Sequence, residues 1–302
     1  MAITKLNQIF EQLKGMSSKK RLVVAFGNDE HSIEATYKAL ELGIVDVTIV
    51  GDEATIKEVC AKHSYDVSKF TIVQESEEVA ATKKAVALIN AGEGDIIMKG
   101  LCSTDKYMRA ILNKQEGLLP PKAILTHVSI MEYAAYDKLL VVSDVAIIPQ
   151  PDFKQKLALI NYVVKTSKAL GVEKPKVAMI AASEQVLPNV IGSTDAAVIA
   201  KMSDRGQIAG CYVDGPLALD TAIDAEAVAI KKLESTVAGD ADCLVFPNLE
   251  TGNVFYKAST KLAKAETGAM LVGAKVPSVL SSRGDSVQTK LNSIALAALT
   301  SK

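Results

Sequence analysis

The chain has 302 residues, of which 49% are hydrophobic and 23% charged, a composition typical of globular proteins. Its 34 basic and 35 acidic residues almost cancel, and neither sign gathers in a block, which argues against a nucleic-acid-binding face. No segment is long and apolar enough for a membrane span, and residues 1–20 lack the continuous apolar core of a signal peptide, so we expect a cytoplasmic protein.

Short β-branched segments alternate with amphipathic helices along the whole chain. The predicted strands are residues 21–26, 45–50, 69–74, 95–98, 123–128, 139–148, 176–181, 207–213, 241–246, 269–272 and 276–280. The first of the predicted helices are residues 32–42, 53–63 and 77–91. This alternation predicts right-handed crossovers and mostly parallel sheets with helices on both faces. Because these strands are many for one sheet, we expect two α/β lobes, residues 1–125 with 270–302, and residues 126–269.

The four cysteines are far apart and lie in apolar segments; they are Cys60, Cys102, Cys211 and Cys243. This spacing is typical of buried thiols in a reducing compartment, and it fits neither a disulfide framework nor a zinc site. We therefore expect no bound metal.

In open parallel sheets, ligands bind beyond the carboxyl ends of the strands. At the first such turn Lys99 ends a predicted strand, and Gly100 permits a tight turn or a close approach of the backbone. Ser103 or Thr104 is expected to cap the following helix, which carries Arg109. Two cations beside a helix start suit an anion, although a plain capped helix would also explain the pattern.

Acidic and polar residues follow three later strands. Asp144 lies in an apolar run, so its carboxylate needs a partner, and its role is either structural or catalytic. Asp214 and Asp220 flank a Gly-Pro turn that is predicted to end a strand. They form an acid–base pair, a pair of metal ligands or a structural turn. Asn253 and Lys257, on the next helix, suit an anionic or amide-bearing ligand, or Lys257 simply faces water.

The segment from Ser281 to Ser286 lies between a predicted strand and a predicted helix that runs to about residue 299. The hydroxyl of Ser282, the guanidinium of Arg283 and several backbone N–H groups would converge there at a helix start, which favours anion binding. Asp285 lies in the same turn. Arginine is rare in this chain, so Arg283 is more than general surface charge, although an ordinary turn with a solvated arginine remains the alternative.

Several familiar sites are missing from the sequence. The histidines are scattered, at His31, His63 and His127. There is no Gly-x-Ser-x-Gly elbow and no Walker loop, which argues against a serine hydrolase and a P-loop nucleotidase. Residues 26–29 follow the first strand without the Gly-x-Gly-x-x-Gly pattern, so dinucleotide binding has little support.

Six motifs, taken in order, cover nearly the whole chain. They are Met98-Lys-Gly-Leu101, Met108-Arg-Ala-Ile-Leu112, Ser143-Asp-Val-Ala146, Asp214-Gly-Pro-Leu-Ala-Leu-Asp220, Pro247-Asn-Leu-Glu-Thr-Gly-Asn-Val-Phe-Tyr-Lys257 and Ser281-Ser-Arg-Gly-Asp-Ser286. In this order they resemble the phosphate acyltransferases, or phosphotransacylases. Residues 201–208, 214–220 and 290–299 are most similar to the butyryl-transferring members.

The resemblance implies a two-lobed fold like that of the isocitrate and isopropylmalate dehydrogenases, usually dimeric, with the active site in the interdomain cleft. It implies the reversible conversion of butanoyl-CoA and phosphate to butanoyl phosphate and CoA, with no bound cofactor. Acetyl or branched acyl groups are alternative substrates. From a different class, a metal-dependent decarboxylating dehydrogenase would use Asp214 and Asp220. A non-catalytic ligand-binding protein is a third possibility.

The resemblance also implies roles for single residues. Ser282 and Arg283 would bind and polarise the acyl phosphate, and Arg109 matches an arginine implicated in CoA binding. Acetyl-transferring members carry an aspartate, proposed to deprotonate the CoA thiol, where this chain has Thr289. The general base therefore stays open; the candidates are Asp144, Asp214 and Asp285. The predicted substrate-binding residues are Lys99, Gly100, Ser103, Thr104, Arg109, Asn253, Lys257 and Asp285.

Overall fold

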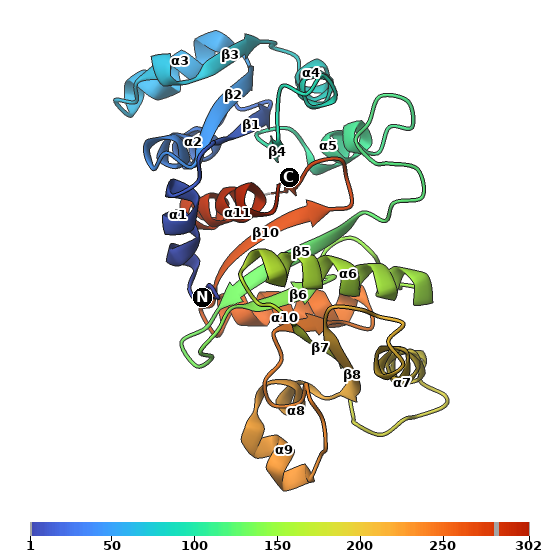
Figure 1. The fold of residues 1–302 in the computed structure, drawn as a ribbon. Coiled ribbons are helices and arrows are strands. Elements are labelled where there is room, and N and C mark those ends of the chain that lie inside the picture. Colours follow the sequence, from blue (N-terminus) through green and yellow to red (C-terminus); the bar gives the residue numbers. More distant parts are fainter. Residues whose placement is uncertain (1, 281–283, 302) are drawn as a thin grey trace. The chain divides into compact units, whose positions relative to one another are not determined.

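The computed structural model describes residues 2–280 and 284–301, so Ser282 and Arg283 lie outside the described residues. The chain divides into two compact units. The first unit comprises Leu6–Leu125 and Thr267–Lys302, and the second comprises Met1–Lys5 and Thr126–Glu266. In each unit, helices pack on neighbouring strands (Figure 1).

The strands of the first unit lie in the order β3-β2-β1-β4-β11-β10. Its strands are β1 (Lys20–Ala25), β2 (Val45–Gly51), β3 (Thr71–Gln74), β4 (Ile96–Lys99), β10 (Glu266–Val272) and β11 (Ser278–Val279). All neighbours are parallel except β10 and β11, which pair antiparallel. Because β1, β4 and β11 are parallel neighbours, the loops that follow them leave the sheet at one edge.

Helices of the first unit begin at short polar caps. They are α1 (Leu6–Lys14), α2 (Glu30–Glu41), α3 (Glu53–Lys62), α4 (Glu78–Asn90), α5 (Thr104–Ile111) and α11 (Val287–Thr300), with the 3-10 helix η1 (Val67–Lys69). The side chains of Asp29 and Asp52 accept the free N–H groups of Ser32 and Thr55 at the starts of α2 and α3. Helix α11 packs against α1, α2, β4 and β11, which explains why it is buried along most of its length.

The strands of the second unit lie in the order β5-β6-β9-β7-β8. Its strands are β5 (Thr126–Glu132), β6 (Leu140–Ser143), β7 (Lys176–Ile180), β8 (Tyr212–Leu217) and β9 (Cys243–Val245). Its helices are α6 (Phe153–Ala169), α7 (Ile191–Asp204), α8 (Leu219–Ile223), α9 (Ala225–Lys231) and α10 (Leu249–Lys261). Among these strands only β5 and β6 pair antiparallel, so the predicted mostly parallel α/β fold is confirmed.

Several predicted strands have different bounds in the structure, and two of these differences bear on the candidate site residues. The strand expected at residues 139–148 ends at Ser143, because the next backbone N–H groups bond to the Asp144 side chain instead. The strand expected at residues 207–213 is β8, which runs through Asp214, Gly215 and Pro216, so the prediction that a turn begins at Asp214 is wrong. Strand β8 tolerates Pro216 because it is the edge strand, where a missing N–H leaves no neighbour unpaired.

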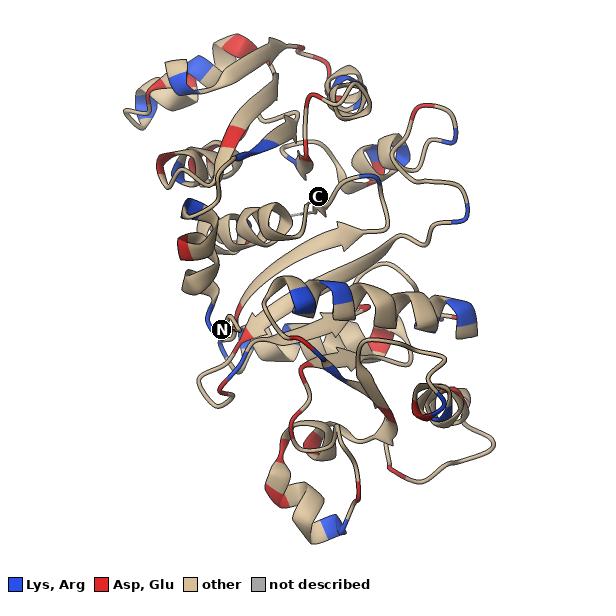
Figure 2. Cartoon of the chain, in the orientation of Figure 1, with Lys and Arg blue, Asp and Glu red and all other residues tan. Residues whose placement is uncertain are grey.

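Charged residues lie mostly on helices and loops, while the strands carry few (Figure 2). The four cysteines are free and buried, as predicted, and burial raises the pKa of each thiol. Among residues 2–280 and 284–301, no helix is long and apolar enough to cross a bilayer. Within the same residues, no three His, Cys, Asp or Glu side chains gather as a metal-ligand set.

Candidate functional site

In the first unit, the loops after β1 and β4 are in direct contact at the carboxyl edge of the sheet. The N–H of Gly100 donates to the carbonyl of Ala25 at 2.9 Å, and the N–H of Leu101 donates to that of Phe26 at 2.7 Å. A Cβ atom on Gly100 would lie 2.4 Å from the Phe26 carbonyl oxygen, far inside contact distance. The predicted close approach of the backbone at Gly100 is therefore confirmed, whereas a contact between Gly100 and substrate stays a prediction.

Lys99 is buried at this edge, with only 3% of its surface exposed. Its ammonium donates to the carbonyls of Gly100 at 3.1 Å and Cys102 at 2.9 Å. Lys99 therefore stabilises the β4–α5 loop through these hydrogen bonds and places a buried positive charge beside it. Any contact between Lys99 and a substrate would come in addition to this structural role.

At the N-terminus of α5, a carboxylate of the protein itself already interacts with the helix start. Of the two predicted caps, Ser103 is the one used, because its hydroxyl accepts the N–H of Lys106 at 3.3 Å and Thr104 is the first helical residue. The carboxylate of Glu78, from α4, accepts the N–H of Ser103 at 2.6 Å and pairs with the ammonium of Lys106. A carboxylate is favourable at the positive end of a helix, so Glu78 takes the place that sequence analysis assigned to a ligand anion.

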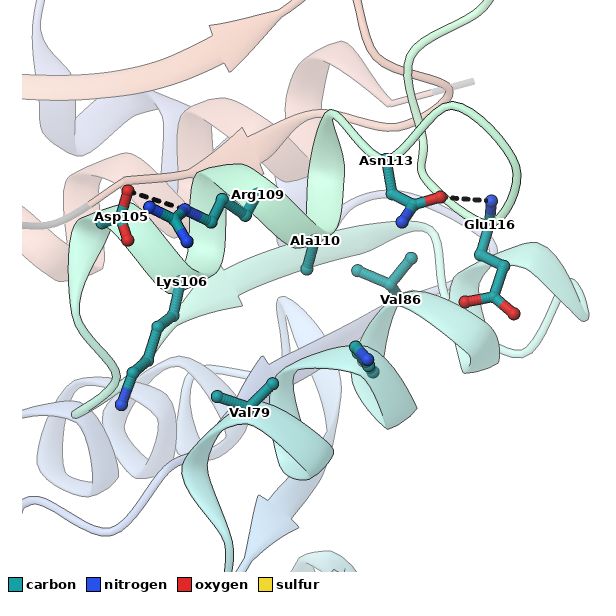
Figure 3. A pocket seen from close by; sticks show the side chains of 9 residues that line it. Val79, Val86, Asp105, Lys106, Arg109, Ala110, Asn113 and Glu116 are labelled. Carbon is teal, nitrogen blue, oxygen red and sulfur yellow. Dashed lines mark hydrogen bonds and ion pairs between the residues drawn. The ribbon is translucent and has the colours of Figure 1, made fainter.

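Arg109 lies on the exposed side of α5. Its guanidinium is 79% exposed and pairs with Asp105 one turn earlier, at 3.0 Å. It lines a cavity of about 300 Å³ between α4 and α5 (Figure 3). The cavity is also lined by Val79, Lys83, Val86, Asp105, Lys106, Ala110, Asn113 and Glu116. Of its three cations, Lys106 pairs with Glu78 and Arg109 with Asp105, so any anionic ligand there would compete with these carboxylates.

The turn before α11 ends at a well-formed cap. The hydroxyl of Ser286 accepts the N–H of Thr289 at 3.1 Å, and the two hydroxyls lie 3.0 Å apart. Asp285 is partly buried just before this cap. One turn into the helix, Lys290 is buried, with 3% of its surface exposed.

In the second unit, Asp144 organises the loop after β6. Its Oδ1 accepts the N–H groups of Ala146 at 2.6 Å and Ile147 at 2.9 Å, and its Oδ2 accepts the N–H of Ile148 at 3.1 Å. The hydroxyl of Thr126 donates to Oδ2 at 2.6 Å. An ionised carboxylate has about four acceptor positions, and all four are filled, so the geometry favours a structural role for Asp144 over that of a base.

Helix α10 is anchored to the same loop. The side-chain amide of Asn253 donates to the carbonyl of Val145 at 3.0 Å. Gly252 lies so close that a Cβ atom would be 2.1 Å from the Asp144 carbonyl oxygen. The structure thus brings Asp144 and Asn253 together, while Lys257, on the same helix, is exposed.

Asp214 and Asp220, which were considered as a pair, have different partners. Asp214 lies within β8, and its Oδ1 accepts the N–H of Gly215 at 2.8 Å. Asp220, on α8, pairs with the ammonium of Lys231 at 3.0 Å. The hydrogen bond from Lys231, together with that from the Thr221 backbone N–H, lowers the pKa of Asp220. Asp220 is thereby held ionised by a neighbouring cation on α9.

A model of the family described as "Phosphate acetyl/butaryl transferase" matches residues 4–83 and 77–298. The chain is 45% identical to a phosphate butyryltransferase of Clostridium acetobutylicum, over 98% of each chain. It is 38% identical to a phosphate acetyltransferase of Thermotoga maritima, over 97% of this chain and 99% of that protein.

Solved structures agree on the fold. A branched-chain phosphotransacylase from Enterococcus faecalis superposes with a TM-score of 0.82 at 29% identity, covering 93% of this chain and 98% of that one. A 4-hydroxythreonine-4-phosphate dehydrogenase from Klebsiella pneumoniae, at 13% identity and a TM-score of 0.57, covers 93% of this chain and 98% of its own. This second likeness concerns the fold alone, and it agrees with the predicted dehydrogenase-like architecture.

Proposed function

Since this chain belongs to the phosphate acetyl/butyryl transferase family, we propose that it transfers a butanoyl group reversibly between CoA and inorganic phosphate. The observation that carries the proposal is the 45% identity to a phosphate butyryltransferase over 98% of both chains. Acetyl transfer is the main alternative, because an acetyltransferase is 38% identical over a similar length. Acyl-CoA and phosphate are the substrates, and no bound cofactor takes part.

The reaction requires both substrates to be bound side by side, and it does not require a covalent enzyme intermediate. In one direction the CoA thiol attacks the carbonyl carbon of butanoyl phosphate, and the C–O bond to phosphate breaks as the C–S bond forms. Holding the reacting atoms in place supplies a large part of the rate enhancement. The protein must also stabilise the oxyanion, neutralise the leaving phosphate and accept the thiol proton.

Arg283 and Ser282 are proposed for the phosphate and the oxyanion. Both lie outside the described residues; in the sequence they follow β11, which ends at the same edge as β1 and β4, and they precede the cap of α11. The planar guanidinium of arginine matches two phosphate oxygens at once. The serine hydroxyl donates to the carbonyl oxygen or to the phosphate.

Arg109 and its cavity are proposed for CoA. The cavity between α4 and α5 offers apolar side chains for a ring and the cations Lys83, Lys106 and Arg109 for phosphates. For the general base, Asp285 and Asp214 remain, since the acceptor positions of Asp144 are filled. We favour Asp285, because it lies two residues after Arg283 and hence beside the proposed phosphate site.

The test is thiol release, measured with DTNB, from acetyl-, butanoyl- and branched acyl-CoA in the presence and absence of phosphate. Two extra methylene groups, buried at about 0.8 kcal/mol each, predict that kcat/KM for butanoyl-CoA exceeds that for acetyl-CoA by about tenfold. The variant Arg283→Ala is expected to lose about 3 kcal/mol of transition-state stabilisation, the scale of one lost anion-directed donor. Near-wild-type turnover would remove Arg283 from the mechanism, and a preference for acetyl-CoA would refute the butanoyl assignment.

A further inference from the structure

The second unit contains a cavity of about 690 Å³, lined by the hairpin between β5 and β6 and by residues of α8, α9 and α10. Leu140, in its lining, begins β6, and Gly239 precedes β9, which runs parallel to β6. Asp144 follows the last residue of β6, so the cavity borders the opposite end of that strand. It shares no residue with the cavity proposed for CoA, and its volume lies in the range of about 300–1,000 Å³ that is usual for small-molecule sites.

Three aromatic side chains form part of the cavity wall. The hydroxyl of Tyr133 donates to that of Ser259 at 2.8 Å, and the hydroxyl of Tyr136 donates to the carbonyl of Ala241 at 2.7 Å. The third ring, that of Phe255, comes from α10. Since both hydroxyls are bonded within the protein, the two tyrosines present mainly their rings to a ligand, and the wall is held in place before a ligand binds.

Aliphatic side chains make up most of the remaining interior. They are Leu140 from β6 and Leu219 and Ile223 from α8. Leu219 is 37% exposed, although a leucine gains free energy when it leaves water. Apolar surface that is left open inside a cavity favours a ligand with an apolar body of its own.

The charged groups of the cavity lining are all acidic. They are Asp137, Asp224 and Asp240, and no Lys, Arg or His side chain of the described residues lines the cavity. Asp240 is neutralised by Lys138 at 2.7 Å and Lys176 at 2.5 Å. Asp224 accepts a backbone N–H at 2.9 Å and so caps α9. Within the part of the chain that the structure describes, neither Asp137 nor Asp224 has a cationic partner, so the cavity keeps an excess of negative charge.

The same negative charge acts on the ring of Tyr136. Burial raises the pKa of its hydroxyl, and the carboxylates of Asp240, Asp242 and Asp137 raise it further. The faces of aromatic rings attract cations through the ring quadrupole. The rings and the carboxylates of this cavity therefore favour a ligand of the same charge, a cation, and disfavour an anion.

We propose that this cavity binds a small organic amine in its protonated form. The ammonium lies beside the tyrosine rings and the carboxylates of Asp137 and Asp224, and the apolar body of the ligand contacts the leucine and isoleucine side chains. An aliphatic amine resembles the lysine side chain, whose pKa is about 10.4, so it is charged at neutral pH. The site takes a ligand that is neither acyl-CoA nor phosphate, so the inference goes beyond the proposed function and does not depend on it.

The main test compares three probes that share one aromatic body and differ in charge: phenethylamine, phenethyl alcohol and hydrocinnamate. Calorimetric titration of the whole chain should give a Kd for phenethylamine about tenfold or more below the Kd of the other two. Added salt should weaken the binding of the amine, because the two carboxylates are exposed and salt screens them. Equal affinity for the amine and the alcohol, or no binding of any probe, would overturn the inference.

A double variant, Asp137→Asn with Asp224→Asn, tests the part played by charge. Asparagine caps helices about as well as aspartate, so the Tm should stay as in the wild type. The affinity for phenethylamine should fall to that for phenethyl alcohol, while the affinity for the alcohol should not change. An unchanged preference for the amine in this variant would contradict the assignment of the two carboxylates.

A matched pair of variants tests the location of the site. Ala135 is exposed and lines the cavity, whereas its neighbour Ala134 is exposed and does not line it. Ala135→Trp should fill the cavity and abolish the binding of phenethylamine, and Ala134→Trp should bind it as the wild type does. Phenethylamine should also raise the Tm of the wild type and of Ala134→Trp, but not that of Ala135→Trp, because a ligand stabilises only the folded protein that binds it. Binding of the amine that survives Ala135→Trp would place it elsewhere on the protein and refute the site.

Discussion

The variant Asp144→Asn tests whether the Asp144 carboxylate has a structural or a catalytic role. In the structure Asp144 accepts three backbone N–H groups and the hydroxyl of Thr126. An asparagine places an NH2 group where one oxygen was, so at least one of these N–H groups loses its acceptor in a buried position. A hydrogen bond to a charged group contributes about 1.5–3 kcal/mol, and the bonds that remain become neutral and weaker.

We therefore expect Asp144→Asn to lower the free energy of unfolding by about 3 kcal/mol, with the largest part from the orphaned N–H group. For a unit of about 150 residues this corresponds to a fall in Tm of about 6–12 °C. Calorimetry measures the shift, and Asp204→Asn, an exposed aspartate in an i,i+3 pair with Lys201, serves as the control with no expected change.

The same variants locate the general base. Asp285→Asn should lower kcat by about 10²–10⁴-fold and remove the acidic limb of the pH dependence of kcat/KM, which is the effect of losing a general base. Asp144→Asn should keep that limb. An Asp144→Asn protein with wild-type Tm and a lost acidic limb would refute the argument from filled acceptor positions and make Asp144 the base.

Two further predictions concern single charged side chains. Arg109→Ala should raise the KM for acyl-CoA by about tenfold and leave the Tm unchanged. The rise in KM should become smaller with added salt, because the guanidinium is exposed and salt screens its charge. An unchanged KM at low salt would exclude Arg109 from CoA binding. Partial burial raises the pKa of Glu184, but hydrogen bonds from Thr221 and Lys231 outweigh it and lower the pKa to about 2. Because the folded-state pKa lies below the ordinary value of 4.5, the stabilisation by Glu184 is complete above pH 4.5 and is lost as the pH falls toward 2. The stability of Glu184→Gln, measured by urea unfolding, should therefore fall less steeply over that interval, and equal slopes for the two proteins would contradict the assignment.

The sequence by itself determined the elements and the family. Alternating β-branched and amphipathic segments predicted the mostly parallel α/β fold, because those patterns depend on residues that are near in sequence. Sequence analysis also named Ser103 as one of two possible caps and Gly100 as a site of a tight turn or a close backbone approach, because capping and the lack of a Cβ atom are local properties. Ordered motifs along nearly the whole chain identified the family.

Only the tertiary structure determined which charged and polar groups lie close together. Strand β8 runs through Asp214 because its pairing with β7 continues past the Gly-Pro sequence, and sequence patterns do not report pairing. Glu78 occupies the start of α5 from another helix, and Asp144 bonds to Thr126 across two strands. Helix α11 comes from the end of the chain and packs against β4 and α2 from its first third, which no local sequence pattern reports. Electrostatic interactions depend on distance in space, so only the folded chain determines them.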